Sequence, residues 1–147
     1  MKQFKVALQL YSIREDMQKD MASALKTVKE IGYDCVEFAG YFGQSAEYIR
    51  NLLDEIGLEC ISAHQGYEVF LNNPEEEVAF LETIGAKYCA IPWMDLKKQA
   101  GTESFAKTVE EIKQVGSLLQ QSGIILLYHN HDFEFQTFED KFLLDWL

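Results

Sequence analysis

The three histidines of this 147-residue chain all lie near the ends of short apolar segments, where side chains often carry chemistry. Two of them, His129 and His131, flank Asn130 at the end of one such segment. Because side chains alternate along a strand, both imidazoles would point to one face and Asn130 to the other. Together with Glu134 and His64 they could ligate a divalent ion. The alternative is a set of hydrogen-bonded polar residues that closes the top of the fold.

Two further kinds of residue stand out at segment ends. Glu37 interrupts an apolar segment, which is costly unless its carboxylate is paired or binds a ligand. It could contact a substrate, or it could pair with Arg14 or Lys5. Trp93 and Tyr11 could stack on a sugar ring, although aromatic residues in such places also belong to a core or a lid.

Composition and motifs exclude several classes of function. The net charge of −11 makes nucleic acid an unfavourable partner. The glycines do not have the spacing of a dinucleotide-binding or phosphate-binding loop, and no serine lies in a nucleophile elbow.

The cysteines, at 35, 60 and 89, form no CxxC pair and are expected to be buried apolar residues in a reducing compartment. No apolar run approaches a membrane span, and the opening residues lack a signal-peptide core, so we expect a soluble cytoplasmic protein without membrane contact.

A short sequence motif recurs along the chain. Glu30-Ile31-Gly32 recurs as Glu55-Ile56-Gly57, and weaker copies place Gly85 and Gly123. Glycine just past a helix end adopts the left-handed conformation at little cost, so each copy predicts a helix end followed by a strand. Apolar residues at helical spacing over 21–31, 49–56, 78–84 and 105–119 precede these glycines. Ser45, Pro74 and Thr102 are suitable starts for the last three helices.

The segments after the glycines predict strands that are apolar on both faces. They cover residues 35–39, 60–64, 88–93 and 124–131, and a similar segment at 6–12 precedes the first helix. Strands that alternate with helices and are buried on both faces form a parallel sheet. No linker-like stretch interrupts the series, so residues 1–147 are expected to form a single (β/α) domain.

Two architectures accommodate five βα units: an open flavodoxin-like sheet, or the first five units of an eight-stranded barrel. Eight units in a barrel of about 250 residues take about 31 residues each, so five take about 155. Residues 138–147 look like the opening of a helix that stops short. We therefore predict an α/β fold of the parallel TIM-barrel type, of which this chain is the N-terminal portion.

Two segments also resemble a known family. Residues 7–14 (ALQLYSIR) and 128–135 (YHNHDFEF) are similar to the sugar phosphate isomerase/epimerase family of xylose isomerase-like barrels. The resemblance implies an eight-stranded (β/α) barrel that binds one divalent metal, such as Mn, Mg, Co or Zn. It also implies metal-assisted proton transfer next to the carbonyl of a sugar or sugar phosphate, in isomerisation, epimerisation or dehydration.

The resemblance implies roles for individual residues of this chain. A strand-five glutamate of many relatives corresponds to His129, which makes His129 the expected metal ligand. Glu37, His64, Trp93 and His131 would line the sugar pocket. The remaining ligands and a catalytic carboxylate would come from strands six to eight, so this chain alone is expected to be inactive.

A five-stranded piece of a barrel would have an unpaired strand at its edge. A second copy or a partner chain would close the edge of a five-stranded piece, which predicts a homo-oligomer or a complex. Two other functions stay open: a flavodoxin-like small-molecule binding module without catalysis, and an apurinic-site endonuclease, which would need a basic surface that faces DNA.

Overall fold

The computed structural model describes residues 5–147, and its central feature is a five-stranded parallel sheet. Residues 1–4, on which the expectation of no signal peptide partly rests, lie outside the described residues. Each strand pairs with its neighbours in the sequence, in the order β1-β2-β3-β4-β5. The strands are β1 (Ala7–Gln9), β2 (Cys35–Ala39), β3 (Glu59–His64), β4 (Tyr88–Ile91) and β5 (Ile125–Tyr128).

This strand order decides between the two predicted architectures. A flavodoxin-like sheet has the order 2-1-3-4-5, in which the chain reverses direction across the sheet after its first strand. Here every strand is added on the same side of the previous one, as in a barrel. The fold is therefore the first five βα units of a TIM-barrel type, and the flavodoxin-like alternative is wrong.

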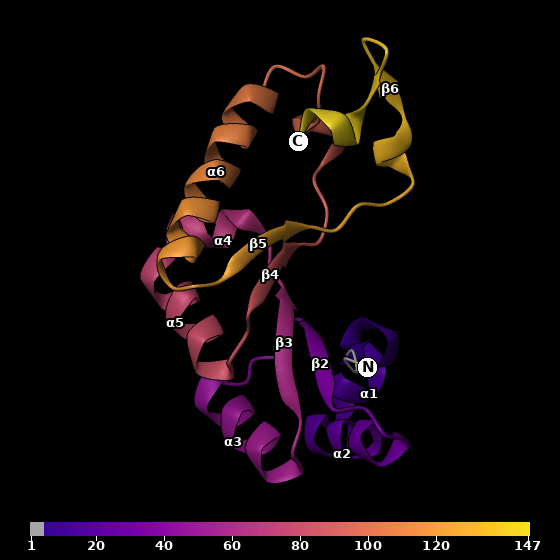
Figure 1. Cartoon of the computed structure of the whole chain (residues 1–147), viewed down its shortest axis with the longest axis vertical. Helices are drawn as coiled ribbons and strands as arrows, with labels where there is room; N and C mark the ends of the chain where they lie inside the picture. The colour runs from indigo at the N-terminus through magenta and orange to yellow at the C-terminus, as the bar shows by residue number, and fades with distance from the viewer. Residues whose placement is uncertain (1–4) are drawn as a thin grey trace.

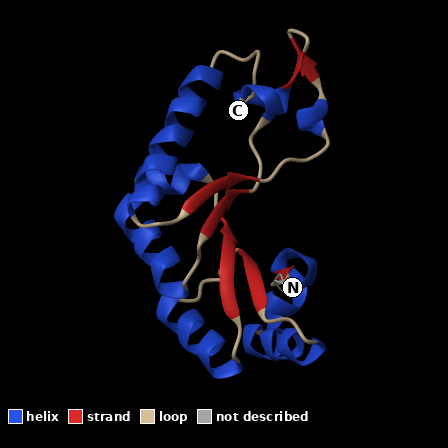
Figure 2. Cartoon of the chain, viewed as in Figure 1, coloured by secondary structure: helices blue, strands red, loops and turns tan. Residues whose placement is uncertain are grey.

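Helices connect the strands and cover the outside of the sheet. They are α1 (Arg14–Lys19), α2 (Met21–Ile31), α3 (Ala46–Ile56), α4 (Tyr67–Asn72), α5 (Pro74–Ile84) and α6 (Phe105–Gln121). In Figure 1, α3, α5 and α6 follow one side of the curved row of strands, and Figure 2 shows the same layering by secondary structure. Within residues 5–147, no helix is long and apolar enough to cross a membrane.

The hydrophobic core lies between the sheet and these helices. The sheet contributes Val36, Phe38, Ala63, Cys89 and Ile91, and the helices contribute Leu25, Ile49, Leu53, Leu81, Ile84 and Leu119. Residues between the sheet's core positions, such as Glu37, face the opposite side, because side chains alternate along a strand. The inner face of the sheet thereby carries polar groups such as Glu37 beside apolar residues such as Leu127. The three cysteines are buried and free, and burial raises the pKa of the Cys60 and Cys89 thiols to about 12, as expected for unreactive core residues.

The predicted helix boundaries are largely confirmed. Gly32, Gly57 and Gly85 end α2, α3 and α5 in the left-handed conformation. The Ser45 side chain accepts a hydrogen bond from Tyr48 N, and Pro74 is the first residue of α5. Thr102 is not the start of α6, because the helix begins at Phe105 and the Thr102 hydroxyl instead donates to Gln99 O at 2.8 Å.

Three predicted strands are shorter than expected. The first ends at Gln9, where the Gln9 side chain accepts from Tyr11 N and starts a 3-10 turn at Leu10–Ile13 that leads into α1. The fourth ends at Ile91, because Pro92 has no N–H for the ladder. The fifth ends at Tyr128, although His129 N still donates to Ile91 O at 3.0 Å.

The predicted helix at residues 138–147 is wrong. The segment forms a hairpin of β6 (Thr137–Phe138) and β7 (Lys141–Phe142), followed by a 3-10 turn at Leu143–Trp146. Glu139 and Asp140 both have positive φ, which is the geometry of a tight two-residue hairpin turn. Trp146 Nε1 donates to Phe138 O at 3.3 Å and their rings pack together, so tertiary contacts override the helical spacing.

Candidate functional site

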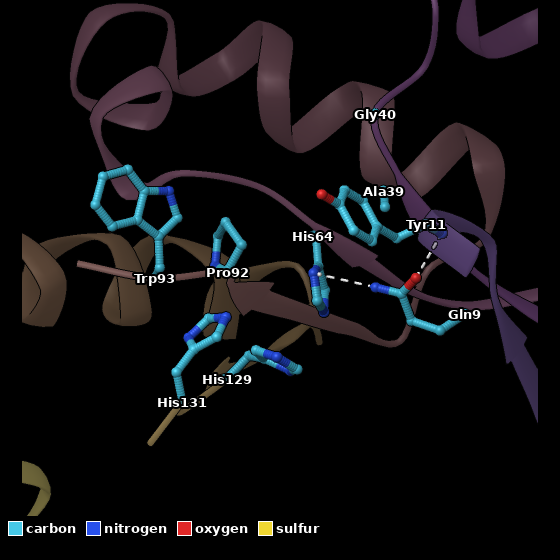
Figure 3. Close-up of a pocket in the computed structure, with 9 residues that line it drawn as sticks. All are labelled: Gln9, Tyr11, Ala39, Gly40, His64, Pro92, Trp93, His129 and His131. Atoms are coloured by element: carbon cyan, nitrogen blue, oxygen red, sulfur yellow. Dashed lines mark hydrogen bonds between the residues drawn. The ribbon is translucent and has the colours of Figure 1, made fainter. Parts of the chain in front are cut away.

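An open pocket of about 440 Å³ lies at the carboxyl ends of the strands, where ligands bind in parallel α/β folds. Figure 3 shows residues from all five strand ends around it. The side chains that could contact a ligand are Gln9, Tyr11, His64, Trp93, His129 and His131. The structure therefore brings all three histidines together with Trp93, as the sequence predicts.

The His64 ring, at the end of β3, contacts side chains from β1 and β2 through both of its nitrogens. Tyr11 N donates to Gln9 Oε1 at 2.6 Å, which fixes the orientation of the amide and leaves its nitrogen 3.4 Å from His64 Nδ1. His64 Nε2 lies 3.1 Å from Glu37 Oε1. Because the amide nitrogen can only donate, Nδ1 accepts and Nε2 carries the proton given to Glu37. Both ring nitrogens of His64 are thus engaged within the protein.

Glu37 lies behind His64 and is not one of the residues that line the pocket. The hydrogen bond from His64 holds the pKa of the Glu37 carboxyl below its ordinary value of 4.5. The two cations considered as its partners are engaged elsewhere: Lys5 pairs with Glu59 at 2.5 Å, and Arg14 Nη1 donates to Tyr11 O at 3.0 Å. Glu37 therefore positions His64 in this structure.

His129 and His131 point into the pocket from the end of β5 (Figure 3). The ring centroid of His129 lies 4.9 Å from that of His64 and 4.9 Å from that of His131. The protein shields the His129 ring in part from water, which lowers its pKa, and the neighbouring imidazoles of His64 and His131 lower it further. In its neutral form the His129 imidazole can both donate and accept a hydrogen bond with a polar ligand.

Glu134, which the sequence placed among the possible ligands, has a different role. It is 1% exposed, and its carboxylate accepts from Tyr128 Oη at 2.5 Å and from His131 N at 2.7 Å. These bonds engage both carboxylate oxygens. Glu134 instead fixes the loop that carries His131. This role could not be predicted from the sequence, because it depends on how the chain turns after Tyr128.

The donor set does not make a metal site on its own. Within the described residues, no group of three or more His, Cys, Asp or Glu side chains is arranged to hold a metal ion. His64 uses both nitrogens internally, which leaves His129 and His131, and imidazole suits zinc or cobalt better than magnesium. The residues present therefore do not fit a resident metal without further ligands, and His129 as a ligand stays a prediction.

Two exposed aromatic side chains flank the histidines. Tyr11 is 58% exposed and Trp93 is 56% exposed, although both line the pocket. The Arg14 guanidinium lies over the Tyr11 ring, 4.5 Å from its centroid. The structural roles of Gln9 and Arg14 in holding Tyr11 were not evident from the sequence, since they depend on the 3-10 turn after β1.

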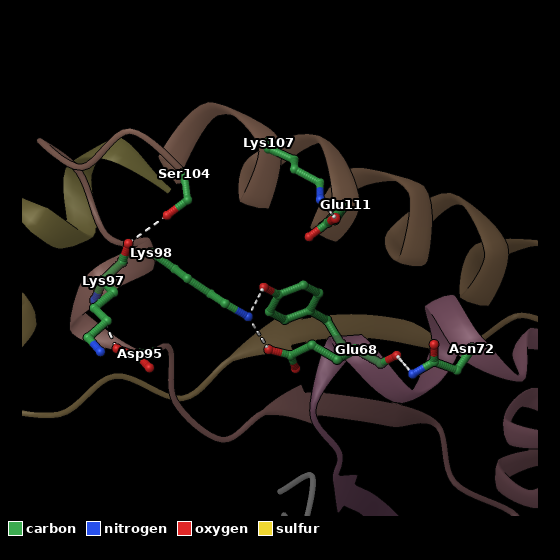
Figure 4. A network of polar contacts seen from close by, with 9 residues as sticks. Glu68, Asn72, Asp95, Lys97, Lys98, Ser104, Lys107 and Glu111 are labelled. Atoms are coloured by element: carbon green, nitrogen blue, oxygen red, sulfur yellow. Dashed lines mark hydrogen bonds and ion pairs between the residues drawn. The ribbon is translucent and has the colours of Figure 1, made fainter.

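The loop that follows Trp93 is anchored by a second polar network (Figure 4). Lys98 Nζ donates to Glu68 Oε1 at 2.7 Å and to Tyr67 Oη at 2.9 Å, which ties this loop to α4. Ser104 Oγ donates to Lys97 O at 2.6 Å. The wall of the pocket that carries Trp93 is thereby attached to the helical layer.

A sequential parallel sheet with a polar pocket at the carboxyl ends of its strands defines the (β/α) barrel class. Residues 25–142 match the family model of the xylose isomerase-like TIM barrel. The match covers most of the chain, so this chain belongs to the xylose isomerase-like TIM barrel family. A search of curated proteins gave no match.

Solved structures share the fold at low sequence identity. A sugar phosphate isomerase/epimerase from Parabacteroides distasonis ATCC 8503 superposes with a TM-score of 0.79 at 22% identity, over 96% of this chain and 59% of that one. A xylose isomerase-like TIM barrel protein from Mycobacterium smegmatis in complex with magnesium gives 0.58 at 16%, over 85% and 54%.

An AP endonuclease, family 2, from Brucella melitensis gives a TM-score of 0.61 at 14% identity, over 73% of this chain and 48% of that one. The chain thus spans about half to three-fifths of the length of these proteins. At these identities the likeness establishes the fold alone.

Proposed function

We propose that this chain supplies the sugar-binding strand ends of a sugar or sugar phosphate isomerase/epimerase, as the N-terminal portion of a complete barrel. The observation that carries the proposal is the convergence of Gln9, His64, His129, His131 and Trp93 on one pocket from four different strands. Among them the His129 and His131 imidazoles have ring nitrogens to offer, and the Trp93 indole can donate, as the hydroxyls of a sugar require. Family membership and fold agree with this choice.

Roles follow for the individual residues. Trp93 packs on the sugar ring, His64 and His131 contact it, and Glu37 holds His64 in place through the 3.1 Å contact. His129 is proposed as a ligand to a divalent cation such as Mn, Mg, Co or Zn. The other ligands would have to come from outside this chain, so no step proposed for these residues depends on the cation.

The chemistry we propose is proton transfer next to the sugar carbonyl. A base removes the proton from the adjacent carbon, the electrons of that bond move to the carbonyl oxygen, and the proton returns to one of the two carbons. We assign no residue of this chain as the base, and we propose that this chain alone does not turn over substrate.

The edge of β5 supports a role for further strands or chains. Within the described residues β5 pairs only with β4, and Ile125 and Leu127 on it are 55% and 43% exposed. We propose that additional barrel strands, a second copy or a partner chain covers this edge. Sedimentation of this chain and of the longest native form would test it: a monomeric five-stranded form stable at high concentration contradicts the proposal.

Deuterium exchange tests the proposed reaction directly. The longest native form of the protein is incubated in D₂O with aldoses, ketoses and their phosphates, and proton NMR follows the hydrogen next to the carbonyl. The proposal predicts that this hydrogen is replaced by deuterium with one substrate, with this chain alone as the inactive control. Absence of exchange with every sugar, by a form shown to be folded, contradicts the proposed function.

A further inference from the structure

We propose that two loops at the rim of the pocket move as one unit, and that this unit opens the pocket by carrying Trp93 and His131 away from His129. The unit, called the rim lobe below, consists of residues 93–104, between β4 and α6, and residues 131–147, after β5. The inference concerns a motion built into the fold, and it does not depend on which ligand the pocket takes.

The two segments of the rim lobe share a small core of their own. Met94 and Ala100 are 1% and 9% exposed, yet neither belongs to the hydrophobic core between the sheet and the helices. The side chains that surround one small void with them come from both segments and from the adjoining ends of β5 and α6: Gln99, Glu134, Leu143, Leu147, Tyr128 and Phe105. Segments that bury side chains against each other open together.

A close contact at Gly101 joins the two segments. A Cβ atom on Gly101 would lie 2.8 Å from Phe138 Cδ2, and the φ of +88° at this residue favours glycine. In Figure 1 the yellow C-terminal segment accordingly lies beside the chain that leads from β4 to α6. Phe138 also contacts Trp146, so the C-terminal hairpin and the turn after it pack on the β4 loop through Gly101.

The ion pair that ties the rim lobe to α4 is partly exposed. The Lys98 and Glu68 side chains are 34% and 51% exposed, so water readily replaces this contact. Each segment also has backbone hydrogen bonds of its own, from Lys98 N to Asp95 O at 2.8 Å and from Leu143 N to Gln136 O at 2.9 Å. Internal bonds and an exposed attachment are the features of a unit that opens before the rest of a domain.

The boundary between the rim lobe and the sheet passes through the pocket, between two neighbouring histidines. His129 N donates to Ile91 O at 3.0 Å, which continues the pairing of β5 with β4 and fixes His129 to the sheet. His131 N donates to the buried Glu134 carboxylate at 2.7 Å, which fixes His131 to the lobe. An opening of the lobe therefore separates the two imidazoles, whose ring centroids lie 4.9 Å apart in the closed form.

Trp93 lies on the lobe side of the same boundary. It immediately precedes Met94, the most buried apolar residue of the lobe, and it follows Pro92, which has no N–H to continue the pairing of β4. Figure 3 shows Trp93 beside His131 and apart from Gln9. The open lobe thus removes one wall of the pocket as a whole.

Native-state hydrogen exchange of this chain, followed by NMR over a series of low urea concentrations, tests the inference. After correction for intrinsic rates, the amides of Lys98, His131 and Leu143 should exchange through one shared opening. The amides of His129 and of Gln65, which donates to Ala90 O, should exchange at least about tenfold more slowly. His129 and His131 are two residues apart, so this difference reports the boundary itself.

Gly101→Ala should open the lobe selectively. The added methyl group meets the Phe138 ring in a backbone conformation that favours glycine, so the three lobe amides should exchange about tenfold faster by a common factor. The sheet amides should stay within about twofold. Gly32→Ala is the matched control, because Gly32 also has a positive φ but ends α2 with no atom near its added methyl group. It should leave the lobe amides within about twofold.

Lys98→Met gives the same test without adding strain. It removes the exposed ion pair with Glu68, and the amides of His131 and Leu143 should exchange about threefold faster. Lys107→Met removes another exposed ion pair, with Glu111 on α6, and should leave them unchanged. Circular dichroism establishes that each variant is folded.

Three results would overturn the inference. If Gly101→Ala speeds the lobe and sheet amides by the same factor, the chain opens only as a whole. If Lys98 responds and Leu143 does not, the two loops move separately. If the His131 amide follows those of the sheet, the boundary does not divide the pocket. None of these results bears on the proposed isomerase/epimerase function, which hydrogen exchange at the sugar tests separately.

Discussion

The two sides of the pocket differ in how completely their polar groups are satisfied. On the β1–β3 side, Gln9, His64 and Glu37 form a closed chain in which both nitrogens of His64 have partners. On the β5 side, His129 and His131 point into the pocket, and the inner face of the strand is exposed at Ile125 and Leu127. The side chains of the β1–β3 side are therefore fixed by one another. On the β5 side, the imidazoles can contact a ligand, and the exposed apolar side chains can contact further strands.

The β5 side depends on one buried carboxylate, and its removal should have the largest effect. Glu134→Ala removes a buried carboxylate and leaves the partly buried Tyr128 Oη and His131 N without their acceptor, and we expect a loss of about 2–3 kcal/mol in unfolding free energy. Urea denaturation measures it, and Glu110→Ala on the exposed face of α6 is the control. A loss no larger than that of the control would show that Glu134 does not hold this loop.

Neighbouring leucines on β5 test which face of the strand is covered. Leu126 faces α6, near Gly116, so Leu126→Ser should cost about 2 kcal/mol of unfolding free energy. Leu127 faces the open inner side, and Leu127→Ser should cost less than about 0.5 kcal/mol. Equal losses for the two variants would mean that the inner face of β5 is already covered in solution.

On the closed side, Glu37→Gln should have a smaller effect. The variant keeps the shape but replaces a charge-assisted hydrogen bond from His64 by a neutral one, and we expect about 1 kcal/mol less stability. The nitrogen chemical shifts of His64 give a second measurement, because exchanging the carboxylate acceptor for a neutral amide should move the Nε2 resonance. Unchanged stability together with unchanged His64 shifts would argue against the pairing.

Acid should lower the free energy of unfolding through the two sides of the pocket over different pH ranges. The folded-state pKa values of His129 and Glu37 both lie below their ordinary values of 6.5 and 4.5, so the unfolded chain takes up each proton more readily. Each group therefore contributes stability above its ordinary value and loses it as the pH falls through the folded value. Replacing His129 by Asn should flatten the stability curve below pH 6.5, and Glu37→Gln should flatten it only below pH 4.5. The same curve for both variants would contradict the assignment.

The sequence predicted the framework well, because the framework depends on local patterns. The motif that ends in Gly32 and recurs at Gly57 and Gly85 marks helix ends. The strand β2 has its predicted bounds. Strand ends were less predictable: β1 stops where the Gln9 side chain reaches Tyr11 N. The C-terminal hairpin was missed because the contact between Trp146 and Phe138 outweighs the helical spacing.

The candidate site also has features that the sequence could predict and features that it could not. His64, Trp93, His129 and His131 could be found because ligand groups gather at the carboxyl ends of parallel strands. The partner of Glu37 could not be found, since it depends on the register that pairs Ala39 with His64 and so places Glu37 nearby. Residue type alone cannot show which polar groups are already satisfied.

The nitrogen NMR spectrum of the three histidines, recorded with and without xylose, tests the central comparison most directly. We predict that the nitrogen shifts of His64 are the same in both spectra, because both of its ring nitrogens have partners within the protein, and that those of His129 and His131 change when the sugar binds. A change of tautomer or a large shift of His64, with His129 and His131 unmoved, would contradict the division between a closed side and a free side of the pocket.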